Sequence, residues 1–344
     1  RYVINGLFLT QRITGIQRYA REIIAELDLL VQNNEIIIVV PKDTKDVPAY
    51  KNLKIVRYGY LNGILWEQLC LPLFIIKERA SGVHLCNVVP LLYPRGIAVI
   101  HDVCYKVNPQ FYTTLRDKTS MLWHRLNYLW ISWFTKTIVT VSNFSKQEIV
   151  KNYHVKNNRI HVIYSAWQHI LRIKATDKIF KKFSQLKPKE YFFAMSSIQA
   201  NKNFHWILKT AKANPQEKFA IAGSGGLKKL GGDLGLKDLP NVFYLGYVSD
   251  EDAKALMMNC KAFLFPTLYE GFGLPPLEAI ACGSNIVVSD TECMHEIYKH
   301  NATYIKYIYD VFKEELQSNN INTLNCYSWA ASAKDLYKIM IIYR

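Results

Sequence analysis

The feature that most constrains the fold is a regular alternation of short apolar runs with longer segments of helical spacing. Apolar runs of strand length include Ile36–Val40 and Ile97–Ile100 in the first half, and Tyr191–Met195 and Ala262–Phe265 in the second. Between such runs, Gln17–Leu30 carries apolar residues three or four positions apart, which is typical of an amphipathic helix. Because strands that alternate with helices usually form parallel sheets, the sequence predicts an α/β fold with two doubly wound parallel sheets facing across a cleft.

The length supports two domains, because 344 residues are more than one hydrophobic core usually organises. We place the first domain at residues 1–170, the second at 171–325, and a terminal helix that packs back on the first domain at 326–344. The irregular, basic stretch Trp167–Lys189 is interpreted as the linker. No uncharged apolar stretch of about 18 residues is present, so no membrane-spanning helix is expected. No secretory signal is visible and the cysteines lack paired spacing, which favours a cytoplasmic protein.

The stretch Tyr269–Ala279 carries the strongest functional signal. Glu270 and Glu278 flank a glycine-rich turn that precedes a helix. The backbone N–H groups of Gly273 and Leu274, at the positive end of that helix, are expected to form a phosphate-binding site. The alternative is that the carboxylates only complement the helix dipole and the glycines only make the turn.

Two positions in the first half also lie where ligands bind. Gly15 follows a short strand and opens a helix whose N-cap is predicted to be Thr14, so its backbone could approach a phosphate closely. His101 and Asp102 end the strand Ile97–Ile100, and ligands of open α/β sheets bind at carboxyl strand ends. The alternatives are a simple turn glycine and a structural pair in which Asp102 orients the imidazole.

The stretch Glu270-Gly271-Phe272-Gly273-Leu274-Pro275, with Leu277-Glu278-Ala279 and Gly283, resembles the motif of two Glu separated by seven residues in the retaining glycosyltransferases of family 4. These group 1 glycosyl transferases have the GT-B fold. The resemblance extends over nearly the whole chain and is strongest from residue 190 to 290. This sequence departs from the usual pattern at Asn201, where the family has Arg, at Gln199-Ala200 in place of Glu-Pro, and at Ser165-Ala166 in place of Asn-Gly.

The resemblance implies a role for each candidate residue. Glu278 would bind the ribose hydroxyls of a nucleotide-diphosphate sugar, and Glu270 would bind sugar hydroxyls and steady positive charge at the anomeric carbon. His101 would contact the donor sugar. Lys202, Gly15, Gly273 and Leu274 would hold the diphosphate, and Ser197, Gly223 and Val248 would lie in loops near the nucleotide. No metal site and no cofactor other than the donor are expected, because positive protein groups can replace a metal.

The charge suggests an anionic partner. The net charge is +15, and residues 1–160 hold 21 Lys and Arg against 11 Asp and Glu. The segment Met121–Phe134 mixes aromatic with basic residues, so it is either an amphipathic helix on the inner face of an anionic membrane or an ordinary buried helix. Nucleic acid is not an expected partner, since no nucleic-acid motif accompanies the charge.

The resemblance thus implies a metal-independent, retaining hexosyltransferase of polysaccharide or cell-envelope biosynthesis. It would move mannose, rhamnose, glucose or a similar sugar to a glycan or polyprenyl-linked acceptor. Two alternatives remain open. One is another enzyme with the same fold, such as a nucleotide-sugar epimerase or a phosphorylase. The other is a non-catalytic, basic protein that binds membrane or nucleic acid.

Overall fold

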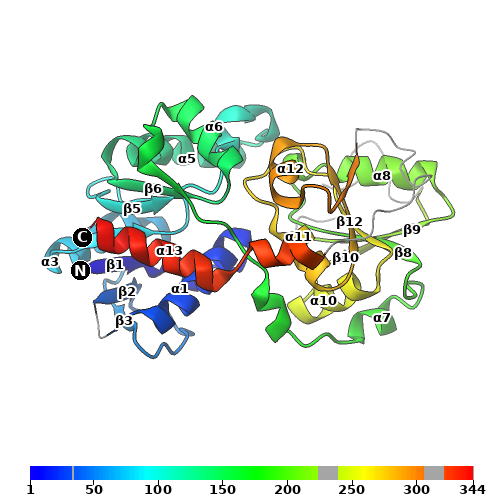
Figure 1. Ribbon diagram of the computed structural model, residues 1–344, viewed down its shortest axis with the longest axis horizontal. Helices are drawn as coiled ribbons and strands as arrows, with labels where there is room; N and C mark the ends of the chain where they lie inside the picture. The colour runs from blue at the N-terminus through cyan, green and yellow to red at the C-terminus, as the bar shows by residue number, and fades with distance from the viewer. Residues whose placement is uncertain (33–34, 224–238, 306–320, 344) are drawn as a thin grey trace. The chain divides into compact units, whose positions relative to one another are not determined.

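The computed structural model describes residues 1–32, 35–223, 239–305 and 321–343. The chain forms two units (Figure 1). The first unit comprises Arg1–Ser165 together with Ser328–Arg344, and the second comprises Ala166–Tyr327. In each unit every recorded strand pairing is parallel, which confirms the predicted α/β class.

The first unit is built on a sheet with strand order β3-β2-β1-β4-β5-β6-β7. Its inner strands are buried on both faces because helices cover the sheet, and β2 and β5 accordingly carry no polar side chain. The strands are β1 (Tyr2–Asn5), β2 (Ile36–Val40), β3 (Lys54–Arg57), β4 (Ser81–His84), β5 (Gly96–Val99), β6 (Thr137–Thr140) and β7 (Ile160–Val162).

The helices of the first unit include a long continuous segment made of α2, a π-helical turn and α3. Thr14 occupies the N-cap of α1, as predicted. Ser142 occupies the N-cap of α6, where its side chain accepts a bond from the backbone of Ser145. The helices are η1 (Gly6–Thr10), α1 (Gly15–Leu30), α2 (Gly63–Leu65), η2 (Trp66–Cys70), α3 (Leu71–Lys77), α4 (Cys104–Val107), η3 (Pro109–Phe111), α5 (Leu115–Phe134), α6 (Asn143–Tyr153), η4 (Asn157–Arg159) and α13 (Trp329–Ile342).

The last helix of the chain belongs to the first unit. Ser328 is the N-cap of α13, which packs along α1 (Figure 1). The rings of Trp329 and Tyr19 meet edge to face with centroids 5.9 Å apart, and the Tyr2 hydroxyl donates to the carbonyl of Met340 at 2.7 Å. The first unit is therefore discontinuous in sequence.

The second unit has a sheet with strand order β10-β9-β8-β11-β12-β13. Numbered from the first strand of the unit, this is the order 3-2-1-4-5-6 of a doubly wound nucleotide-binding fold. The strands are β8 (Tyr191–Met195), β9 (Lys218–Ala222), β10 (Val242–Gly246), β11 (Ala262–Phe265), β12 (Asn285–Ser289) and β13 (Thr303–Ile305). The helices are η5 (Gln168–Arg172), α7 (Lys178–Lys182), η6 (Ala200–Lys202), α8 (Phe204–Ala213), α10 (Asp250–Asn259), α11 (Leu274–Ala281), α12 (Glu292–Tyr298) and η9 (Ile321–Cys326).

The interpretation of Trp167–Lys189 as a linker is wrong. The boundary between the units lies at Ser165 and Ala166, and the stretch that follows packs into the second unit. His169, Ile170, Ile179 and Leu186 are buried there, and the Lys254 amine donates to the carbonyls of Ile170 and Ile173. The stretch forms only short helical turns, which these tertiary contacts hold in place. Its sequence therefore shows no long helical spacing.

Candidate functional site

The candidate residues of the second unit come from loops at the same edge of one sheet. All strands of this sheet are parallel, so the loops that follow β8, β9, β10 and β11 meet at the carboxyl edge. These loops carry Lys202, Gly223, Val248 and Glu270 in turn. The strand order reverses between β8 and β11, and such a switch point is where open α/β sheets bind ligands.

Lys202 and Glu270 form an ion pair at this switch point. The Lys202 amine contacts the Glu270 Oε1 atom, and the two side chains are 17% and 13% exposed. Oε1 also accepts a bond from the Thr267 hydroxyl at 2.9 Å. A lysine amine has three donors and a carboxylate has two oxygens, so both groups retain capacity for a ligand. The arrangement places a positive and a negative side chain next to each other at the mouth of the sheet.

The two loops that carry this pair are joined through Asn201. The Asn201 carbonyl accepts from the Leu268 backbone N–H at 2.7 Å and from the Thr267 hydroxyl at 3.0 Å. These bonds hold the loop after β8 against the loop after β11. Because both bonds use the backbone carbonyl, they do not depend on the side chain at position 201, where the family usually has Arg.

The N-terminus of α11 presents backbone donors at the same edge. Gly273 is its N-cap with φ of +82°, a conformation that favours glycine, and its carbonyl accepts a bond from the Tyr298 hydroxyl. No acceptor among the described residues is recorded for the N–H groups of Gly273 and Leu274. Two prolines follow Leu274 and have no N–H, so these donors are the ones that the helix start offers to an anion.

Glu278 lies one turn inside α11 and is buried against a histidine that sequence reasoning missed. The Nε2 atom of His169 is 2.8 Å from Glu278 Oε1, and the His169 side chain is only 2% exposed. His169 belongs to η5, inside the stretch interpreted as a linker. Its signal in the sequence is a histidine between apolar residues, which does not identify a partner 109 positions away.

The remaining candidates of the second unit lie where neighbouring strands end. Gly223 packs so closely that an added Cβ would lie 2.0 Å from the Ser196 carbonyl oxygen, which explains the glycine structurally. Ser197 is half-buried in the adjacent loop, and its carbonyl accepts from Gln199 N–H at 2.9 Å. Val248 is buried, next to the exposed Tyr247. The rest of the predicted glycine loop, 224–226, lies outside the described residues.

In the first unit, His101 is a buried, neutral histidine. Burial lowers its pKa to about 4, and its Nε2 lies 2.9 Å from the Leu85 carbonyl. Because the bond to a carbonyl needs a proton on Nε2, the neutral ring keeps Nδ1 as an acceptor. Asp102 accepts from the Cys104 backbone N–H at 2.8 Å, so the recorded partner that orients the imidazole is Leu85.

Gly15 occupies the first position of α1 and is exposed. An added Cβ there would meet no atom within 4 Å, and the residue does not adopt the left-handed conformation. The local fold therefore does not require glycine at this position, unlike at Gly223 and Gly273.

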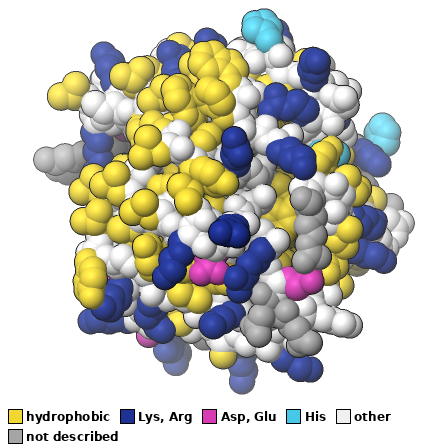
Figure 2. All heavy atoms as spheres, turned by 90° about the vertical axis from the view of Figure 1, so that its left-hand side faces the viewer, with side chains coloured by type: hydrophobic (Ala, Val, Ile, Leu, Met, Phe, Trp, Pro, Cys, Tyr) yellow, Lys and Arg dark blue, Asp and Glu magenta, His cyan; other side chains and the backbone are white. Residues whose placement is uncertain are grey.

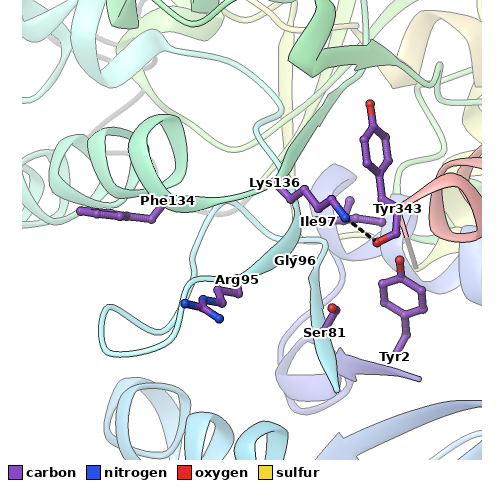
Figure 3. A pocket seen from close by; sticks show the side chains of 8 residues that line it. All are labelled: Tyr2, Ser81, Arg95, Gly96, Ile97, Phe134, Lys136 and Tyr343. Atoms are coloured by element: carbon purple, nitrogen blue, oxygen red, sulfur yellow. Dashed lines mark hydrogen bonds between the residues drawn. The ribbon is translucent and has the colours of Figure 1, made fainter. Parts of the chain in front are cut away.

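Two cavities in the first unit are lined by other residues. One, of about 360 Å³, lies at the carboxyl ends of β1 and β2 and includes Thr10, Asp43 and Asn62. The other, of about 300 Å³, lies at the opposite strand ends, among Arg95, Lys136 and Tyr343 (Figure 3). Among the described residues no group of three His, Cys, Asp or Glu side chains is suited to hold a metal ion.

Both halves of the chain match models of known glycosyltransferase families. The family model described as Glycosyltransferase Family 4 matches residues 13–166, and the model described as Glycosyl transferases group 1 matches residues 175–325.

Curated relatives carry names from bacterial glycan synthesis. The chain is 30% identical to a Campylobacter jejuni N,N'-diacetylbacillosaminyl-diphospho-undecaprenol alpha-1,3-N-acetylgalactosaminyltransferase, over 84% of this chain and 82% of that protein. It is 26% identical to the Escherichia coli O-antigen chain mannosyltransferase B, over 83% and 81%. It is 32% identical to the Salmonella typhimurium O-antigen chain mannosyltransferase RfbU over 49% of this chain, an alignment that spans 46% of RfbU.

Solved structures share the fold at low sequence identity. Sucrose-phosphate synthase from Thermosynechococcus elongatus superposes with a TM-score of 0.73 at 13% identity, covering 100% of this chain and 99% of that one. Anabaena HepE in complex with UDP and glucose superposes with a TM-score of 0.69 at 14% identity, covering 98% of each chain. These likenesses identify the fold as GT-B.

Proposed function

Because this chain belongs to the glycosyltransferases of family 4, we propose that it transfers a hexose from a nucleotide-diphosphate sugar to a glycan or lipid-linked acceptor, retaining the anomeric configuration. The observation that carries the proposal is the Lys202–Glu270 ion pair at the switch point of the second sheet, beside the N–H groups of Gly273 and Leu274, which have no acceptor among the described residues. A sugar diphosphate can be bound by a cation and backbone N–H donors at its phosphates and by a carboxylate at its sugar hydroxyls. Mannose is the favoured sugar, since RfbU and mannosyltransferase B are named for it.

In this proposal the diphosphate is bound by Lys202 and by the start of α11. One donor of the Lys202 amine stays on Glu270 and the others reach the phosphate oxygens, so the pair need not break completely when the donor binds. The N–H groups of Gly273 and Leu274 add a charge-assisted contact. As the bond between sugar and phosphate breaks, these groups stabilise the negative charge on the leaving diphosphate.

The two carboxylates take separate parts of the donor. Glu270, which is ion-paired with Lys202, faces the sugar, where its other oxygen accepts hydroxyl bonds and steadies positive charge at the anomeric carbon. Glu278, held by His169, accepts from the ribose hydroxyls. His101 and Gly15 of the first unit are proposed to contact the donor sugar and the diphosphate, and Ser197, Gly223 and Val248 to border the nucleotide.

Nucleotide binding is the first test. We expect GDP, UDP or dTDP at 100 times its Kd to stabilise the protein by about 2.7 kcal/mol, and the matching sugar nucleotide to be consumed only with acceptor. Glu278→Gln should raise the donor KM, corresponding to roughly 1–3 kcal/mol, with little change in kcat. Isomerised donor or phosphorolysis without transfer would instead indicate an epimerase or a phosphorylase. Salt-sensitive binding of membrane or nucleic acid without any nucleotide binding would indicate a non-catalytic protein.

The proposal includes catalysis without a metal and a cytoplasmic location. Lys202 supplies positive charge at the diphosphate, so transfer should persist in excess chelator. Abolition by chelator with rescue by Mg²⁺ or Mn²⁺ would contradict this part alone, because it leaves the transferase activity in place.

A further inference from the structure

The segment from α2 to α3 has apolar side chains on both of its faces. The inner face is closed core, with Trp66, Leu71 and Ile75 fully buried. The outer face carries a second row that is 46% to 61% exposed, here called the α2–α3 ridge: Ile64, Leu65, Leu69, Leu73 and Ile76. Surface helices of globular proteins normally turn polar side chains outward, so the ridge has the composition of a buried face without a cover among the described residues.

Helix α5 lies beside this ridge on the same face of the sheet. The connections from β3 to β4 and from β5 to β6 run in the same direction across the sheet, so right-handed crossovers place α3 and α5 on one side. The loop before β5 joins them: Gln68 Nε2 donates to the Val89 carbonyl at 3.1 Å, and Trp130 Nε1 donates to the Leu91 carbonyl at 2.8 Å. The loop and the end of α5 add exposed Leu92, Trp133 and Phe134.

The charges around this apolar surface are almost all positive. Of the acidic residues in the same segments, Glu67 is buried, Glu78 pairs with Arg1, and Asp117 is in the capping box of α5. Figure 2 turns the end of the first unit that carries α3 toward the viewer and shows hydrophobic side chains gathered on one side with Lys and Arg beside them. The basic residues of these segments are Lys77, Arg79, Arg95, Arg116, Lys118, Arg125 and Lys136.

We propose that the α2–α3 ridge and the adjoining end of α5 dock this protein on an anionic lipid bilayer. The ridge enters the interface, and the basic residues contact lipid phosphates. Arg95 and Lys136 line the 300 Å³ cavity beside Phe134, and the Lys136 amine donates to the Tyr343 carbonyl at 3.1 Å (Figure 3). The sequence left open whether Met121–Phe134 lies on a membrane or is an ordinary buried helix, and the present proposal centres the lipid contact on the ridge instead. The proposal goes beyond sugar transfer, because binding to vesicles needs neither donor nor acceptor.

Charge favours a bilayer over a second copy of this chain. A two-fold dimer through the ridge would bring one basic rim against another, since such an interface uses the same patch twice. Anionic headgroups neutralise that rim instead.

The test is partition of the full chain onto vesicles. We expect binding to vesicles with 30% phosphatidylserine, about tenfold weaker binding when the salt is raised from 0.1 to 0.5 M, and little binding to pure phosphatidylcholine. The double variant Leu69→Ser/Leu73→Ser should bind at least about tenfold more weakly. The matched control is Leu29→Ser, which removes a 70% exposed leucine from α1, on the other face of the sheet.

Melting temperatures and sedimentation decide between the outcomes. Both variants should melt like the wild type, since the changed side chains are exposed. Equal vesicle binding by the double variant and the wild type would overturn the proposal. A wild-type dimer in the absence of lipid that the double variant abolishes would assign the ridge to self-association and overturn it as well.

Discussion

At the scale of single residues, the contact of His169 with Glu278 offers a test of what holds this buried carboxylate in place. His169 is a positioning residue, because in the proposed mechanism it acts on the donor only through Glu278. His169→Phe leaves the buried carboxylate without this N–H donor, so we expect a donor KM at least tenfold higher, about 1.4 kcal/mol, with kcat nearly unchanged. Steady-state kinetics with varied donor measure this split.

Two further variants separate positioning from simple loss of stability. His169→Gln replaces the N–H donor and should restore most of the donor affinity. In a Glu278→Gln background, His169→Phe should add little to the KM. A large additional effect in that background would show that His169 has a role apart from Glu278.

Gly15 offers a cleaner residue-scale test, because space around its Cα is open. A valine there should change the free energy of unfolding by no more than about 0.5 kcal/mol, as expected for a surface position. If Gly15 lets the backbone approach the diphosphate, Gly15→Val should nevertheless cripple transfer and raise the donor KM. A melting temperature and a KM on one preparation give both values. Lower stability with normal donor affinity would make Gly15 an ordinary turn residue.

At the scale of elements, the segment α2–η2–α3 buries a carboxyl group inside its π-helical turn. Burial raises the pKa of Glu67 to about 7, although Asn5 donates to its Oε1 atom at 2.5 Å. The folded state thus holds a proton that the unfolded chain releases near pH 4.5. This stabilisation is complete below about pH 4.5 and is lost as the pH rises through 7, by up to about 3 kcal/mol.

Glu67→Gln should therefore flatten the pH dependence of stability. The amide keeps an acceptor for Asn5 but cannot ionise, so the variant should gain stability relative to the wild type as the pH rises from 5 to 8. Chemical denaturation at several pH values measures the difference. Glu35→Gln, at an exposed position, is the control for removing one carboxylate from the surface. Parallel curves for Glu67→Gln would mean that Glu67 is ionised throughout.

The same elements show what the sequence could and could not predict. Ile36–Val40, Tyr191–Met195 and Ala262–Phe265 are strands with the predicted bounds, because fully buried parallel strands are continuous apolar runs. The run Val83–Cys86 also predicts a strand, but the strand lies at Ser81–His84, and the Leu85 carbonyl contacts His101 instead. The edge strand Thr303–Ile305 was missed because three residues carry little pattern.

The same difference between local and long-range signals applies to the residues of the candidate site. Glu270 and the start of α11 were proposed from local signals, a glycine turn and a proline, whereas Lys202 was proposed only from its register with the family motif. The contact between His169 and Glu278 could not be predicted, because long-range pairing leaves no local pattern. Periodicity also cannot tell an apolar ridge from a buried face, so the exposure of Leu69 and Leu73 is visible only in the structure.

At the scale of the whole molecule, the first unit depends on residues from both ends of the chain. Trp329, Ala333 and Leu336 of α13 are at most 1% exposed, so removing this helix uncovers apolar surface of α1. A chain truncated after Tyr327 should lose several kcal/mol from the first unit, at roughly 1.5–3 kcal/mol for each large buried side chain.

Limited proteolysis with mass spectrometry tests this expectation. Residues 1–165 of the truncated chain should be digested, and a fragment close to 166–327 should persist. Resistance of residues 1–165 would show that α13 is dispensable for the first unit. The full-length chain under the same digestion is the control.

The discontinuity of the first unit also sets an order of events during synthesis. Helix α1 leaves the ribosome some 300 residues before α13, which at 5–20 residues per second is a delay of roughly 15 to 60 s. The second unit, continuous from Ala166 to Tyr327, has all its residues before the first unit receives its last helix. The nascent chain therefore carries the uncovered apolar side of α1 for most of its translation, and this is the interval in which a chaperone would be needed.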